Sequence, residues 1–139
     1  MLPARNRMRA SDKFVYTIRR GRRSGNKHLV VYAAYAQRHA PVADLPQVGF
    51  VVSKAVGNSV VRHRVVRQLR HCMREFLADL DADFIVVRAL RPITECSSAQ
   101  MSDLLSRELT RLGALRVRDI LVAHKGDGDE AERLSPSSR

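Results

Sequence analysis

The sequence predicts one α+β domain, a two-layer sandwich in which helices pack against a small β-sheet. Segments with helical and strand-like apolar spacing follow one another in the order α-β-β-α-β-α. A chain of 139 residues with 45% hydrophobic side chains is long enough for one core. We place the domain at residues 1–124. Residues 125–139, rich in Gly, Ser and charge, are expected to form a disordered tail.

The first predicted element is a short helix over residues 11–20. Ser11 and Asp12 offer side-chain oxygens that can cap its free N–H groups. Phe14 and Ile18 lie one turn apart and share a face. Residues 21–26 (GRRSGN) are typical of a basic turn.

Three segments have the character of strands. Residues 28–36 are rich in Val and Tyr, and residues 47–53 form a second apolar run. The loop between them, residues 37–46, contains two prolines. Residues 83–89 are almost continuously apolar, which is typical of a strand buried on both faces.

The longest predicted helix covers residues 58–80, with Asn58 or Ser59 as its cap. At 100° per residue its apolar side chains form one stripe, and its basic side chains lie nearly opposite. Arg62 falls on the apolar side, and we expect it to project past the end of the core. The apolar stripe is Val65, Leu69, Cys72, Met73, Phe76 and Leu80, and the basic face is His63, Arg67, Arg70, His71 and Arg74.

The last predicted helix runs from residue 97 to about 112. Ser97 and Gln100 have the spacing of a capping box. Residues 116–124 fit a short strand or a helix equally well.

The charge is concentrated in the N-terminal half. Residues 1–74 hold 16 Lys/Arg and 2 Asp/Glu, whereas residues 75–139 hold 9 and 12. No carboxylate lies between Asp44 and Glu75. A helix face exposed only to solvent is the simpler alternative, but such a face usually mixes charges of both signs. A face of one sign favours a polyanion such as RNA, and arginine suits phosphate through its planar donor fork.

Several function classes are disfavoured by the sequence. The basic segment has no paired carboxylates to hold catalytic metals, and the five histidines form no zinc-ligand spacing with the two cysteines. Two cysteines are too few for a disulfide framework, which favours a reducing cytoplasm. No apolar run approaches 18 residues, so we expect no membrane association.

The run VSKAVGNSVVRHRVVRQLR, residues 52–70, resembles the signature of the bacterial ribonuclease P protein subunit, approximately V-S-K-K-V-G-N-A-V-x-R-N-R-x-K-R-x-x-R. The resemblance extends over residues 2–113 and includes Arg5-Asn6-Arg7. Two positions of its Arg-Asn-Arg-x-Lys core depart from it, since His63 replaces the usual Asn and Val66 replaces the usual Lys. The matching residues are Val52, Ser53, Lys54, Val56, Gly57, Asn58, Val60, Arg62, Arg64, Arg67 and Arg70.

The resemblance implies a ribosomal protein S5 domain 2-like fold with a left-handed βαβ crossover. It also implies a non-catalytic protein component of an endoribonuclease. A catalytic RNA subunit, with Mg²⁺ bound mainly by that RNA, would remove the 5′ leader of precursor tRNA. The protein itself would bind no cofactor and would be a monomer outside the ribonucleoprotein.

The resemblance further implies two sets of site residues. Phe14, Ile18 and Tyr32 map to a cleft for the single-stranded leader, although Ile18 replaces a frequent aromatic and both aromatic residues fit a hydrophobic core as well. The residues that would bind the RNA subunit are Lys54, Asn58, Arg62, His63, Arg64, Arg67 and Arg70.

Three competing interpretations remain. A ribosomal or general RNA-binding protein without a role in tRNA processing would carry the same charge and the same helix. A protein-only nuclease and a DNA-binding regulator fit less well, because catalytic carboxylates and a helix-turn-helix pair are not evident. The length of the signature favours the ribonuclease P interpretation.

Overall fold

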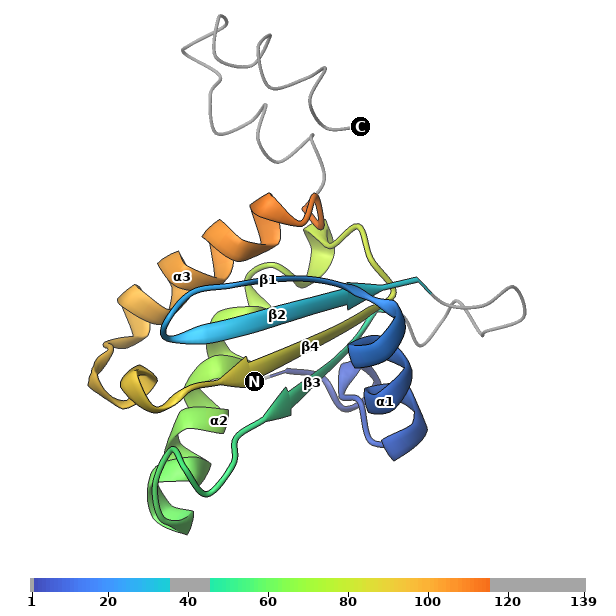
Figure 1. Cartoon of the computed structure of the whole chain (residues 1–139). Helices are drawn as coiled ribbons and strands as arrows, with labels where there is room; N and C mark the ends of the chain where they lie inside the picture. Colours follow the sequence, from blue (N-terminus) through green and yellow to red (C-terminus); the bar gives the residue numbers. More distant parts are fainter. Residues whose placement is uncertain (1, 36–45, 116–139) are drawn as a thin grey trace, which may run out of the picture.

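The computed structural model describes residues 2–35 and 46–115, and in these residues one four-stranded sheet packs with three α-helices (Figure 1). The predicted α+β class is confirmed. Short 3₁₀ turns cover Ala4–Asn6, Leu77–Asp79 and Arg91–Glu95. The main elements are α1 (Ser11–Arg20), β1 (Arg22–Gly25), β2 (Leu29–Ala34), β3 (Gln47–Val51), α2 (Ser59–Arg74), β4 (Phe84–Ala89) and α3 (Ser98–Arg111).

The strand order is β1-β2-β4-β3, so β3 lies at one edge of the sheet. β2 pairs with β1 and with β4 in antiparallel fashion, whereas β3 and β4 are parallel. Because α2 connects these two parallel neighbours, β3–α2–β4 is a βαβ crossover. The left hand of this crossover stays a prediction. The connection places the start of α2 close to the end of the edge strand.

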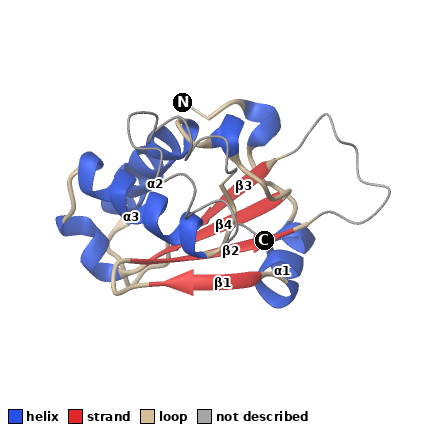
Figure 2. Cartoon of the chain, turned by 90° about the horizontal axis from the view of Figure 1, so that it is seen from above, coloured by secondary structure: helices blue, strands red, loops and turns tan. Residues whose placement is uncertain are grey.

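The helices cover both faces of the sheet (Figure 2). α2 and α3 pack on one face, where Leu69 and Leu105 are fully buried with Val31 and Ile85. α1 lies on the opposite face, where it contacts β2 and β4. Every residue of β2 is buried as a result, because both of its faces are covered. The predicted two-layer sandwich is formed by the sheet with α2 and α3, and α1 adds partial cover.

The first difference from the sequence prediction is β1, which replaces the predicted basic turn. Its pairing places Arg23 opposite Tyr32 and Ser24 opposite Val31. The segment has no apolar alternation, so only the partner strand reveals it. The segment becomes a strand because it pairs with the edge of β2, and its own sequence does not predict this pairing.

The second difference is the end of α2, which stops at Arg74 rather than at Leu80. The Phe76 N–H donates to the Met73 carbonyl at 3.0 Å, a tighter pattern that closes the last turn. Leu80 is still buried, but it reaches the core from beyond the 3₁₀ turn Leu77–Asp79. Apolar spacing predicted that Leu80 is buried, but it did not show that the α-helix ends before this residue.

The predicted caps have different outcomes. The Asn58 side chain accepts from the Val61 N–H at 2.9 Å, and the Ser97 capping box with Gln100 is present. The capping role of Ser11 and Asp12 was wrong, because Ala10 is the N-cap and makes no side-chain bond. Both residues instead belong to the first turn of α1.

The remaining predictions fall partly or wholly outside the described residues. These are most of the loop 37–46, the undecided segment 116–124 and the tail 125–139. The domain boundary at residue 124 therefore stays a prediction. Among the described residues, no helix is long and apolar enough to cross a membrane.

Candidate nucleic-acid interface

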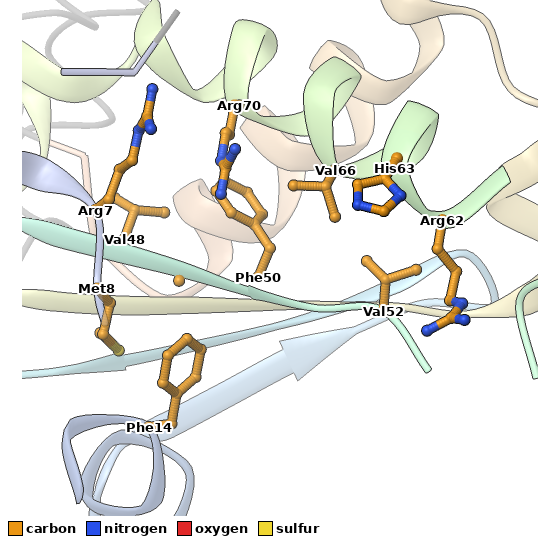
Figure 3. A pocket seen from close by; sticks show the side chains of 11 residues that line it. Arg7, Met8, Phe14, Val48, Phe50, Val52, Arg62, His63, Val66 and Arg70 are labelled. Carbon is orange, nitrogen blue, oxygen red and sulfur yellow. The ribbon is translucent and has the colours of Figure 1, made fainter. Parts of the chain in front are cut away.

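A groove of about 480 Å³ runs along the edge strand β3 (Figure 3). α2 forms one wall, and the N-terminal segment together with α1 forms the other. The floor is apolar and comes from β3 and the residue just after it. The lining residues are Arg7, Met8, Phe14, Val48, Gly49, Phe50, Val52, Arg62, His63, Val66 and Arg70.

The N-terminal segment is fixed beside β3 by backbone and side-chain hydrogen bonds. Arg7 forms a parallel bridge with Val48, and the Met8 N–H donates to the Val48 carbonyl at 2.9 Å. The buried Asn6 side chain donates to the Pro46 carbonyl at 2.7 Å. These contacts hold Arg7 at the groove, at the end where Arg70 of α2 lies (Figure 3).

Two arginines of the groove have buried nitrogen atoms without partners. The Nε atoms of Arg62 and Arg70 are inaccessible to solvent, and neither finds an acceptor among the described residues. Burial lowers the pKa of Arg70, and the charges of Arg7 and Arg9 lower it further. An unpartnered buried donor costs about 1–3 kcal/mol. An anion in the groove would therefore accept hydrogen bonds from these Nε atoms and reduce the repulsion between the arginines.

The expectation that Arg62 projects past the core is refined by this placement. Arg62 is half-buried and lies beside Val52 at the end of the groove (Figure 3). Arg62 lies on the apolar side of α2, but at this position that side of the helix faces the groove along β3 and not the main core.

His63 and Val66, which depart from the Arg-Asn-Arg-x-Lys core of the signature, both line the groove. The His63 ring has Nδ1 2.8 Å from the Ser59 carbonyl oxygen, one turn earlier in α2. The ring is exposed, and its other nitrogen is available to a ligand. Val66 contributes an apolar surface instead of a cation.

The other predicted RNA-binding residues lie on the outer surface of α2 and on the turn before it. Lys54, Arg64 and Arg67 are exposed, and within the part of the chain that is described they form no ion pair. Asn58 caps the helix, and the positive N-terminal end of the helix adds to the positive electrostatic potential of this surface. The predicted set is thus divided between the groove and the outer face.

The three residues predicted for a leader cleft have different environments. Phe14 is half-buried in the groove, where its ring packs so closely on Gly49 that a Cβ there would overlap it. Ile18 is 36% exposed and does not line the groove. Tyr32 is only 5% exposed, belongs to the core cluster on the α1 face, and has the Arg23 guanidinium 6.0 Å from its ring centroid. The core alternative describes Tyr32 best in this structure.

The described residues contain no group of three or more His, Cys, Asp or Glu side chains that would hold a metal ion. Cys72 is buried and its Sγ lies 3.4 Å from the Ser98 carbonyl. Burial, followed by the charge of Glu75, raises the pKa of this thiol, so it acts as a small packing group.

Comparison with known proteins identifies the family. The sequence profile of the Ribonuclease P family matches residues 2–113, which include the whole groove and α2. The chain belongs to the ribonuclease P protein family. A ribonuclease P protein component from Nocardioides is 47% identical over 116 residues, covering 82% of this chain and 97% of the relative. The same component of Beutenbergia cavernae is 49% identical over 114 residues, covering 81% and 92%.

Solved ribonuclease P protein structures share the fold. The protein of Staphylococcus aureus superposes with a TM-score of 0.68 at 22% identity, covering 80% of this chain and 98% of that one. The protein of Thermotoga maritima gives 0.61 at 19% identity, covering 73% and 92%. The shared fold therefore persists at low sequence identity.

Arg7 is a cationic residue of the groove to which the sequence analysis assigns no binding role. In the sequence it belongs only to the Arg5-Asn6-Arg7 match. The signal available in the sequence was an Asn between two arginines, and the structure shows that this Asn6 is buried and donates to the Pro46 carbonyl.

Proposed function

We propose that this chain is the protein subunit of ribonuclease P, which binds a catalytic RNA and the 5′ leader of precursor tRNA. The observation that carries the proposal is the pair of buried, unpartnered Nε atoms of Arg62 and Arg70. They lie in a groove without carboxylates, within the segment that matches the family. Phosphate oxygens are the acceptors that best satisfy such donors.

The two parts of the α2 surface suit two parts of an RNA backbone. In the groove, Arg7, Arg62 and Arg70 would surround one stretch of phosphates. On the outer face, Lys54, Arg64 and Arg67 would contact an adjacent stretch, with additional N–H donors at the helix start near Asn58. Such contacts position an RNA without reading its sequence.

The α1 side of the groove is the proposed place for the leader. Phe14 offers a partly open ring next to the cationic wall, and a stacked base would contribute roughly 1–3 kcal/mol. Ile18 would add apolar contact from the same helix. Tyr32 would support this surface from within the core cluster on the α1 face, where it is buried.

In this proposal the RNA subunit performs the cleavage with its own Mg²⁺, and the protein supplies no catalytic group. The cations of the groove would offset phosphate repulsion near the substrate. The protein would act in the cytoplasm, as a monomer before it joins the RNA.

The test is reconstitution with the cognate RNA subunit and 5′-labelled precursor tRNA at low Mg²⁺. Cleavage should require both protein and RNA. The double variant Arg62→Ala/Arg70→Ala should bind the RNA subunit at least tenfold more weakly, because each arginine makes a charge-assisted hydrogen bond worth about 1.5–3 kcal/mol. Arg107→Ala, an exposed arginine of α3, is the matched control and should behave like wild type.

Two results would contradict the proposal. Cleavage by the protein alone would indicate a protein nuclease. Binding of unrelated RNAs with the same affinity, and no effect on cleavage, would indicate a general RNA-binding protein.

A further inference from the structure

We propose that His63 links RNA docking to the uptake of a proton. In this proposal a phosphate of the bound RNA lies at His63 Nε2, and the imidazole becomes positively charged as the complex forms. The inference rests on the proposed RNA-docking role of the groove. It concerns a residue at which this chain departs from the signature of its family.

The tautomer follows from the contact with Ser59. A backbone carbonyl can only accept a hydrogen bond, so His63 Nδ1, 2.8 Å from that oxygen, must carry the proton. In the neutral ring Nε2 then has a lone pair and no hydrogen. A lone pair repels a phosphate oxygen, whereas a protonated Nε2 donates to it. A phosphate at this position therefore requires the imidazolium.

The charged side chains that line the groove together with His63 are all arginines. On α2, Arg62 is its neighbour, Arg67 is one turn away on the outer face, and Arg70 lies farther along the groove. The N-terminal segment contributes Arg7 to the same groove. β3 and α1 contribute only apolar groups, and no carboxylate lines the groove. RNA phosphate would supply the negative charge that favours the imidazolium.

Val66 removes a positive charge that the family signature has near residue 63. The family signature places a lysine at this position, a permanent cation one turn from residue 63. Here the permanent charge is missing, and protonation of His63 would restore it only when phosphate is present. Histidine changes charge near physiological pH, which makes it suited to this conditional role.

The consequence is an RNA affinity that rises as the pH falls. Binding that takes up a proton is favoured by a higher proton concentration, and each unit by which phosphate raises the pKa of an imidazole corresponds to tenfold in affinity. We expect the Kd for in vitro transcribed ribonuclease P RNA to decrease roughly tenfold from pH 8 to pH 6 at constant ionic strength. Calorimetry at pH 7 in buffers of different ionisation enthalpy should show net proton uptake.

Three variants test the assignment. His63→Asn should remove most of the pH dependence, and His63→Lys should remove it while binding at pH 8 about as tightly as wild type does at pH 6. His71→Asn is the matched control, because His71 is exposed on the same helix but does not line the groove. It should retain the wild-type pH dependence.

The outcomes separate this inference from the proposed function. RNA binding with the same pH dependence in wild type and His63→Asn would overturn the role of His63 alone. An affinity that falls as the pH falls would also overturn it, since a neutral Nε2 would then accept from a ribose 2′-hydroxyl. Absence of RNA binding at every pH would overturn the docking function itself.

Discussion

Glu108 of α3 is fully buried, and its carboxylate joins three parts of the fold. Ser24 Oγ donates to it at 2.5 Å, Asn26 Nδ2 at 2.8 Å, and Arg111 Nη1 lies 3.3 Å away. Burial alone would raise the pKa of this carboxyl. The hydrogen bonds from Ser24 and Asn26, helped by Arg111, outweigh burial and lower it. This residue therefore holds the β1–β2 hairpin against α3.

We predict that Glu108→Gln lowers the free energy of unfolding at pH 7 by about 1–3 kcal/mol, because an amide cannot accept from all of these donors. A carboxyl with a lowered folded pKa stabilises the protein above its unfolded pKa, near 4.5, and this contribution disappears as the pH falls through the folded pKa. Urea unfolding of variant and wild type at pH 7 and pH 4 should show a smaller difference at pH 4.

Asp103→Asn on the same helix is the control for this change, because Asp103 is exposed. An equal loss of stability in both variants, or a difference that grows toward low pH, would contradict the role of the Glu108 hydrogen bonds.

At the scale of the element, α2 has a side that packs in the core and a cationic side. Its periodicity predicted the buried Val65, Leu69, Cys72 and Met73 correctly. Periodicity could not show that Arg62 and Arg70 face β3 while Arg64 and Arg67 face solvent. That division depends on the edge strand, which lies beside one flank of the helix.

We predict that Arg67→Ala weakens RNA-subunit binding and makes the logarithmic salt dependence of the affinity shallower by about one unit, since one phosphate contact is lost. Filter binding at several salt concentrations measures this slope. His71→Ala on the same exposed side of α2 should change it less. An unchanged slope in Arg67→Ala would place Arg67 outside the RNA contact.

At the scale of the whole molecule, the groove brings together cationic residues that are far apart in the sequence. The groove combines Arg7 from the N-terminal segment with arginines more than fifty residues later in the chain, and the acidic residues lie mostly after Glu75. Such a cationic surface near the substrate should replace part of the Mg²⁺ that an RNA enzyme needs to offset phosphate repulsion.

We therefore predict that the protein lowers the Mg²⁺ concentration at which the RNA subunit reaches half-maximal single-turnover cleavage. Arg62→Ala/Arg70→Ala should shift this midpoint back toward that of RNA alone, and Arg107→Ala should not. The same midpoint with and without wild-type protein would remove this role.

The sequence by itself determined the fold class, most elements and the family, because apolar periodicity and a long basic signature are local properties of the chain. It also determined that the positive charge is concentrated in the first half of the chain. Only the tertiary structure decided that β1 is a strand, that Tyr32 is buried, and that Arg7 joins Arg62 and Arg70 in one groove. These features depend on which segments pair across the sheet, and the local sequence of a segment does not specify its distant partner.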